Sequence, residues 1–191
     1  MPDALVLYAS VEGQTARIAE RVAAHMRSHG HRVDVAPAGT DLELSDYAGV
    51  IVGASVHYGR HPAWLARLLR RQRLRGLKSA FFSVSLGAKE RYATRFLRRA
   101  HWRPDLVAVF PGALQYSQYG TLKRLVMRAF AAIVGHDTDT TQDYEYTDWK
   151  AVERFASAFS ETLACRPPAN LVPEQIDLRQ QAGQRRGGRR V

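Results

Sequence analysis

The chain has 191 residues, a net charge of +10 at neutral pH and a single cysteine. This length suits one domain with a substantial core and is too short for two full domains and a tail. One cysteine excludes a disulfide framework and a cysteine metal cluster, which favours a reducing compartment. The sequence contains no run of roughly 20 apolar residues and no basic segment leading into a signal-like apolar run, so we expect neither membrane spanning nor export.

In the first half of the chain, continuously apolar runs alternate with segments whose apolar residues recur at helical spacing. The expected elements, in order, are a strand at 4–8, a helix at 15–29, strands at 32–36 and 49–53, and a helix opened by Pro62. Gly30 directly follows the first helix, at the position where a glycine commonly ends one.

The second half repeats this alternation. The expected elements are a strand at 79–84, a short helix at 90–100, a strand at 106–110 and a final helix from Trp149 to Leu163, capped by Thr147 or Asp148. Strands that are apolar throughout and alternate with amphipathic helices indicate a parallel sheet with both faces covered. The sequence therefore predicts a doubly wound α/β domain.

Three loops at the expected carboxyl ends of the strands are rich in glycine, serine or aromatic residues: 10–15, 54–59 and 85–87. Ligands of doubly wound sheets bind at this edge. In the first loop, backbone N–H groups and the hydroxyls of Ser10 and Thr15 precede a helix whose dipole favours an anion. The three loops together predict a phosphate-binding site.

Taken alone, the sequence of the first loop is also compatible with an ordinary strand-to-helix turn. The prediction of a phosphate-binding site therefore depends on all three loops occurring in this order. Gly13 allows close approach of the backbone to a ligand. The loop contains no lysine, which excludes a Walker nucleotide site. It also lacks the pattern G-x-G-x-x-G, which argues against a Rossmann dinucleotide site.

More specific patterns accompany these loops. The segments GQT, VIVGASVHYG, AFFSVSL, WRPD, GALQY and YTDW follow one another along the chain. In that succession they resemble the flavodoxin-like, quinone-dependent protoporphyrinogen oxidases of bacterial haem biosynthesis, and loop 10–15 resembles the FMN phosphate loop of flavodoxins. The resemblance runs from Ala4 to Leu163. It implies a flavodoxin-like doubly wound five-stranded parallel sheet with a long-chain-type insertion after strand 5, in a domain spanning 1–165.

The resemblance also implies an FMN cofactor and assigns its binding residues. The phosphate would be held by Ser10, Val11, Glu12, Gly13, Gln14 and Thr15. The two sides of the isoalloxazine ring would lie along Ser55, Val56, His57, Tyr58 and Gly59 and along Ser85, Leu86 and Gly87. No metal site is expected.

Three of these positions carry further expectations. Tyr58 is the candidate for stacking on the ring, with a tyrosine that only covers the strand ends as the alternative. His57 is a candidate for proton transfer, with a surface histidine as the alternative, and the sequence identifies no other catalytic group. Glu12 stands where ordinary flavodoxins have a neutral hydroxyl residue. Because a carboxylate repels phosphate, we expect Glu12 to point outward and offer only its N–H.

The insertion, at about residues 117–143, is expected to contain an amphipathic helix in the segment TLKRLVMRAFAAIVG. Its apolar residues share one face, and Lys123, Arg124 and Arg128 lie off that face. A helix of about 20 Å is too short to cross a bilayer but suits its interface, where it would bring reduced FMN to a membrane quinone. Packing of this face on the protein body or on a second subunit is the alternative.

Basic residues crowd the segment 60–103, in which Glu90 is the only acidic residue. This charge suits the propionates of a porphyrinogen or an anionic lipid, and a solvated helix face is the alternative. Residues 166–191 are rich in Pro, Gln, Gly and Arg and are expected to form a disordered basic tail. No specific nucleic-acid binding is expected, because the sequence has no helix-turn-helix, RNP or zinc-finger pattern.

The resemblance implies an oxidoreductase that converts protoporphyrinogen IX to protoporphyrin IX. Its electrons would pass through FMN to menaquinone or ubiquinone at the cytoplasmic face of the membrane. A flavodoxin-type soluble electron carrier and a flavodoxin-like NAD(P)H:quinone oxidoreductase are the alternatives. The basic charge and the insertion favour the dehydrogenase over the carrier, since such carriers are typically acidic. The sequence does not indicate which quinone reacts or whether the chain forms a homo-oligomer.

Overall fold

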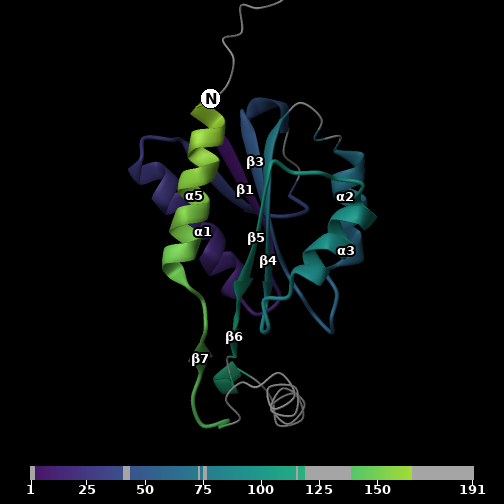
Figure 1. Cartoon of the computed structure of the whole chain (residues 1–191), viewed down its shortest axis with the longest axis vertical. Helices are drawn as coiled ribbons and strands as arrows, with labels where there is room; N and C mark the ends of the chain where they lie inside the picture. Colours follow the sequence, from purple (N-terminus) through teal and green to yellow (C-terminus); the bar gives the residue numbers. More distant parts are fainter. Residues whose placement is uncertain are drawn as a thin grey trace, which may run out of the picture.

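Five parallel strands form the central sheet of the computed structural model, in the order β2-β1-β3-β4-β5 (Figure 1). The strands are β1 (Ala4–Ala9), β2 (Val33–Pro37), β3 (Gly49–Ser55), β4 (Lys78–Ser85) and β5 (Leu106–Pro111). The structure describes residues 3–40, 44–72, 74, 77–114, 116–118 and 139–164. The strand order reverses between β1 and β3, and such a switch point is where doubly wound sheets bind ligands.

Helices cover both faces of this sheet (Figure 1). One layer holds α1 (Gln14–Ser28) and α5 (Trp149–Ala164), and the other holds α2 (Ala63–Arg71) and α3 (Glu90–Ala100). A short 3-10 helix, Leu44–Asp46, precedes β3. Within the described residues no helix is long and apolar enough to cross a membrane.

Two hydrophobic cores lie on opposite sides of the sheet, because successive side chains of a strand point to opposite faces. Val6 and Phe82 pack into the core under α1 and α5. Leu5 and Phe81 pack into the core under α2 and α3. This arrangement explains why the central strands β1 and β3 are apolar along almost their whole length: a strand covered on both faces has no solvent side.

The predicted α/β fold is confirmed, and the predicted elements differ from the observed ones mainly at their ends. The helix at 90–100 has the predicted bounds, whereas β4 begins and ends one residue outside the predicted 79–84. Asp148, one of the two expected caps, accepts a hydrogen bond from the backbone N–H of Ala151 (3.0 Å). Most of the expected insertion, including its predicted helix, and the expected tail lie outside the described residues.

A small ribbon beyond the sheet was not predicted. Strands β6 (Ala113–Leu114) and β7 (Tyr144–Glu145) pair antiparallel, and the ribbon lies beyond the carboxyl ends of the sheet strands, at the bottom of Figure 1. A short 3-10 helix, Tyr116–Gln118, follows β6. Two residues per strand are too few to show the alternating pattern by which strands are recognised in a sequence.

Gly53 on β3 has no room for a side chain. A Cβ atom built at this residue would lie 2.0 Å from Cζ of Phe82 on the neighbouring strand. We expect Gly53→Ala to lower the unfolding free energy by about 2 kcal/mol, since overpacking a core displaces side chains. Urea unfolding of Gly53→Ala, Phe82→Leu and the double variant tests this account. The smaller leucine should relieve the clash, so purely additive effects of the two changes would contradict the proposed cause.

Candidate functional site

The three loops singled out in the sequence meet at one edge of the sheet. They follow β1, β3 and β4, which are adjacent strands, and all three end at the lower edge in Figure 1. The Ser55 hydroxyl donates to the carbonyl of Ala9 (3.2 Å), and the N–H of Val56 donates to the carbonyl of Val84 (2.8 Å). These bonds join the second loop to the ends of the strands on either side.

The first loop forms an open helix start. The N–H of Gly13 donates to Oγ of Ser10 (3.0 Å), and Gly13 adopts a left-handed conformation with φ +88°. Helix α1 begins at Gln14, and no side chain among the described residues caps it. The first N–H groups of an α-helix have no acceptor within the helix and carry the positive end of its dipole. This loop can therefore bind an anion through backbone donors.

The other residues of this loop differ in how exposed their side chains are. The Thr15 side chain is buried, whereas Val11 is 55% exposed. Glu12 is only partly exposed, and its Oε1 atom is buried. The expectation that Glu12 points outward is therefore wrong for this atom, which is enclosed in the folded protein.

The Gln14 side chain takes part in a clamp that the sequence did not reveal. Its Nε2 group donates to Oε1 of Glu145 (2.9 Å) and to Oγ1 of Thr147 (2.8 Å). Arg17 donates to Oε1 of Gln14 (3.0 Å) and pairs with Glu145 (3.3 Å). The Thr147 hydroxyl in turn donates to the carbonyl of Pro111 (2.9 Å). The clamp ties α1 to the segment after β7, so Gln14 has only its backbone N–H to offer an anion at the first loop.

The second loop contains a tight turn that presents an aromatic ring to solvent. His57 and Arg60 exchange backbone hydrogen bonds of 2.9 and 3.1 Å. Tyr58 and Gly59 between them both have positive φ values, +47° and +75°, as in a type I′ turn. Tyr58 is 85% exposed, and its ring lies 5.1 Å from the ring of His57, centre to centre. The exposed Tyr58 and the partly exposed His57 form an aromatic pair beside the end of β3.

His61 is hydrogen-bonded to Ser55 at the start of the second loop. It was not among the site residues expected from the sequence. Its Nδ1 donates to the carbonyl of Ser55 (3.0 Å), because a carbonyl only accepts, and its Nε2 accepts from the hydroxyl of Ser83 (3.1 Å). The ring packs edge-on against Phe81 and Phe96. Burial lowers the pKa of His61 to about 4, so the side chain is neutral at neutral pH.

The third loop contributes a buried hydroxyl. Ser85 is 7% exposed, and its Oγ has no hydrogen-bond partner among the described residues. Its carbonyl accepts from the N–H groups of Ala88 (3.1 Å) and Gly112 (3.2 Å), which closes the loop into a turn. Leu86 packs toward the ribbon, and Gly87 is exposed. A buried hydroxyl without a partner is unfavourable, so this position suits contact with a polar ligand atom.

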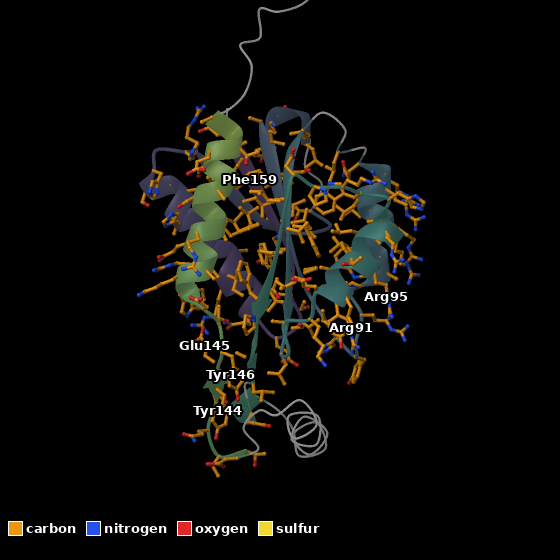
Figure 2. All side chains as sticks on the ribbon, viewed as in Figure 1. Arg91, Arg95, Tyr144, Glu145, Tyr146 and Phe159 are labelled. Atoms are coloured by element: carbon orange, nitrogen blue, oxygen red, sulfur yellow. The ribbon has the colours of Figure 1, made fainter. Side chains whose placement is uncertain are left out.

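Three tyrosines lie beyond the strand ends. Tyr116 is fully buried, and its ring meets that of Tyr144 edge to face at 6.3 Å. Tyr144 and Tyr146 lie 6.3 Å apart with nearly parallel rings. Figure 2 shows Glu145, Tyr146 and Tyr144 below the sheet, in that order from top to bottom. Sequence reasoning gave Tyr144 and Tyr146 no role, because only the ribbon brings them to the site edge.

The edge therefore combines a helix start that no described side chain caps, the aromatic pair of His57 and Tyr58, a buried hydroxyl and an aromatic ribbon. These features suit a planar molecule that carries a phosphate. The described residues contain no group of three or more His, Cys, Asp or Glu side chains placed to hold a metal ion.

Comparison with curated proteins finds relatives that align over most of the chain. The chain is 35% identical to a Leishmania major protein named protoporphyrinogen IX dehydrogenase [quinone], over 90% of this chain and 81% of that protein. It is 33% identical to the Escherichia coli K12 protein of the same name, over 80% of this chain and 91% of that protein.

Solved structures agree at the level of the fold. An archaeal flavodoxin matches with a TM-score of 0.56 at 16% identity, over 85% of this chain and 99% of the other. Flavodoxin 2 from Bacillus cereus matches with a TM-score of 0.54 at 20% identity, over 84% and 99%. A family model described as a flavodoxin domain matches residues 5–141. The chain therefore belongs to the flavodoxin-domain family and, within it, groups with the quinone-linked protoporphyrinogen IX dehydrogenases.

Proposed function

We propose that this chain is an FMN-dependent dehydrogenase that oxidises protoporphyrinogen IX to protoporphyrin IX and passes the electrons to a quinone. The observation that carries the proposal is the name shared by two relatives at 33% and 35% identity, each aligned over at least 80% of both chains. The flavodoxin-domain match and the flavodoxin fold support FMN as the cofactor.

The residues at the site edge fit FMN. The Ser10 hydroxyl and the N–H groups of residues 11–15 would hold the phosphate, and the buried Thr15 would supply a further hydroxyl. Residues 55–59 and 85–87 would flank the isoalloxazine ring. The Ser85 hydroxyl, buried without a partner among the described residues, supports this placement, because a polar ring edge would satisfy it.

When bound, FMN supplies the two-electron chemistry that links the macrocycle to the quinone. The protein's own residues then have to orient the FMN ring, shield it from water and transfer a proton. The exposed ring of Tyr58 would stack on the ring system. Its neighbour His57 is the candidate to take up or deliver the proton. Neutral His61 would act as a positioning residue, because it holds the carbonyl of Ser55 at the start of the second loop.

The acceptor would be menaquinone or ubiquinone, and both are lipid-soluble. We therefore place the enzyme at the cytoplasmic face of the membrane, in peripheral contact with anionic lipid. The strongly basic composition supports this location, since a charge of +10 attracts an anionic surface. The predicted interfacial helix within 117–143 stays a prediction.

A turnover assay distinguishes the proposed enzyme from its alternatives. The FMN-loaded full chain is mixed with protoporphyrinogen IX and a water-soluble quinone under nitrogen, and porphyrin fluorescence is followed against a sample without protein. The proposal predicts porphyrin formation that depends on both protein and quinone. Quinone reduction supported by NADPH but not by porphyrinogen would favour the NAD(P)H:quinone oxidoreductase. A flavin that exchanges electrons only with another redox protein would favour the carrier.

A further inference from the structure

The helical layer formed by α2 and α3 carries exposed positive charge without matching negative charge. We propose that this layer is the surface by which the protein docks on a bilayer containing anionic lipid. The choice of a membrane as the partner rests on the proposed function, because the proposed acceptor is a lipid-soluble quinone. The evidence for a docking surface rests on the charges and contacts of the described residues.

The two helical layers differ in how their arginines are paired. On the α1/α5 layer, arginines pair with acidic residues: Arg17 with Glu145, Arg21 with Glu153 and Arg154 with Asp148. On the α2/α3 layer the exposed arginines are Arg67, Arg70, Arg71, Arg91, Arg95, Arg98 and Arg99. None of these seven forms an ion pair with a carboxylate in the part of the chain that the structure describes. Helices α2 and α3 therefore carry seven exposed arginines against one acidic residue, Glu90 at the start of α3.

The spacing of the arginines along α3 makes their charges repel one another in the isolated protein. Arg95 lies four residues after Arg91 and four before Arg99, so the three guanidinium groups follow one another along one side of the helix. Like charges at this spacing destabilise a helix. Figure 2 shows Arg91 and Arg95 pointing away from the sheet. An external anionic surface would remove this repulsion.

The basic layer continues to the rim of the candidate site. Arg60 directly follows the exposed Tyr58–Gly59 turn, and Lys89 follows Gly87 of the third loop. Both basic residues are exposed. A protein docked through α2 and α3 would thus hold one side of the site against the bilayer, where a lipid-soluble quinone would arrive.

A membrane fits this layer better than a nucleic acid does. The charges are spread over two neighbouring helices that make contact with each other, rather than along one helix shaped for a groove. Trp64 lies one turn before Arg67 on α2 and is 44% exposed, and partly exposed tryptophans are typical of the membrane interface. No motif for nucleic-acid recognition accompanies the charge.

The test compares two variants of equal net charge. Arg95→Gln/Arg99→Gln removes two charges from α3, and the control Lys150→Gln/Arg154→Gln removes two from the exposed face of α5. Binding of the FMN-loaded full chain is measured by sedimentation with vesicles of phosphatidylcholine containing phosphatidylglycerol, and with phosphatidylcholine alone. Each basic group near an anionic surface contributes about fivefold to binding, so the α3 variant should bind about 25-fold more weakly than wild type. The control should stay within about threefold of wild type, since its charges face away from the bilayer.

Further measurements separate the outcomes. Turnover with a water-soluble quinone in the absence of vesicles should be equal in wild type and the α3 variant. If wild type shows no such turnover, the proposed function fails while the docking result still stands. Equal losses of vesicle binding in the two variants would overturn the proposal, because net charge alone would then explain binding. The proposal would also be overturned if the α3 variant lost its binding to poly(U) RNA but kept its binding to vesicles.

Discussion

Replacing Gly13 with valine is expected to lower the affinity for FMN by about 100-fold or more. The φ of +88° at Gly13 places its N–H on Oγ of Ser10 and opens the first turn of α1 toward the site. A β-branched residue strongly disfavours this conformation. The backbone would move, and two or more hydrogen bonds to the phosphate would be lost, each worth about 1.5–3 kcal/mol because the acceptor is charged.

Gly30 provides a matched control for this change. It has nearly the same φ, +90°, and a Cβ atom at either glycine would meet nothing within 4 Å. Gly30 lies at the opposite end of α1, far from the loops of the site. Both valine variants should therefore lose similar stability, about 1–3 kcal/mol. Only Gly13→Val should lose FMN in fluorescence titrations, and equal FMN affinity in the two variants would place the phosphate elsewhere.

His61 is expected to make the stability of the protein depend on pH. Its pKa is about 4 in the folded protein, because the ring is buried, and about 6.5 in the unfolded chain. Between these values the unfolded state binds a proton that the folded state does not. The contribution of His61 is therefore complete above about pH 6.5 and is lost as the pH falls toward 4. The full loss is about 3 kcal/mol, and about 2 kcal/mol of it is reached at about pH 5.

The variant His61→Gln isolates this effect from the other histidines. Glutamine does not titrate, so the unfolding free energy of the variant should fall about 2 kcal/mol less than that of wild type between about pH 7.5 and pH 5. Urea unfolding at the two pH values measures the difference. Parallel pH dependence in the two proteins would mean that His61 titrates normally in the fold and is not the buried neutral group described above.

The main sheet and its ligand edge could be predicted because their signals are local. Apolar runs such as 4–8 report strands that are buried on both faces, and the loops that follow such strands share one edge. Gly13 was singled out because a glycine lets the backbone approach a ligand closely, and its left-handed conformation was found only in the structure.

The remaining features depend on contacts between distant segments. The bonds from Gln14 to Glu145 and Thr147 join residues more than 130 positions apart, and no local pattern marks them. His61 stands beside a proline in a loop, where a histidine is commonly exposed, and in the folded protein it is buried against Phe81 of β4 and Phe96 of α3. The burial of Oε1 of Glu12 is likewise a property of the folded protein that no local pattern marks.

The anaerobic half-reaction tests the central claim most directly. The FMN-loaded full chain is mixed with protoporphyrinogen IX without oxygen or quinone, and flavin absorbance and porphyrin fluorescence are recorded together. The account predicts that protoporphyrinogen IX bleaches the flavin. One FMN accepts only part of the electrons that must leave the macrocycle, so added quinone should both restore the flavin absorbance and allow porphyrin fluorescence to develop. Gly13→Val, which should no longer retain FMN, should show neither change. A flavin that stays oxidised in the presence of protoporphyrinogen IX, while NADPH reduces it readily, would contradict the account.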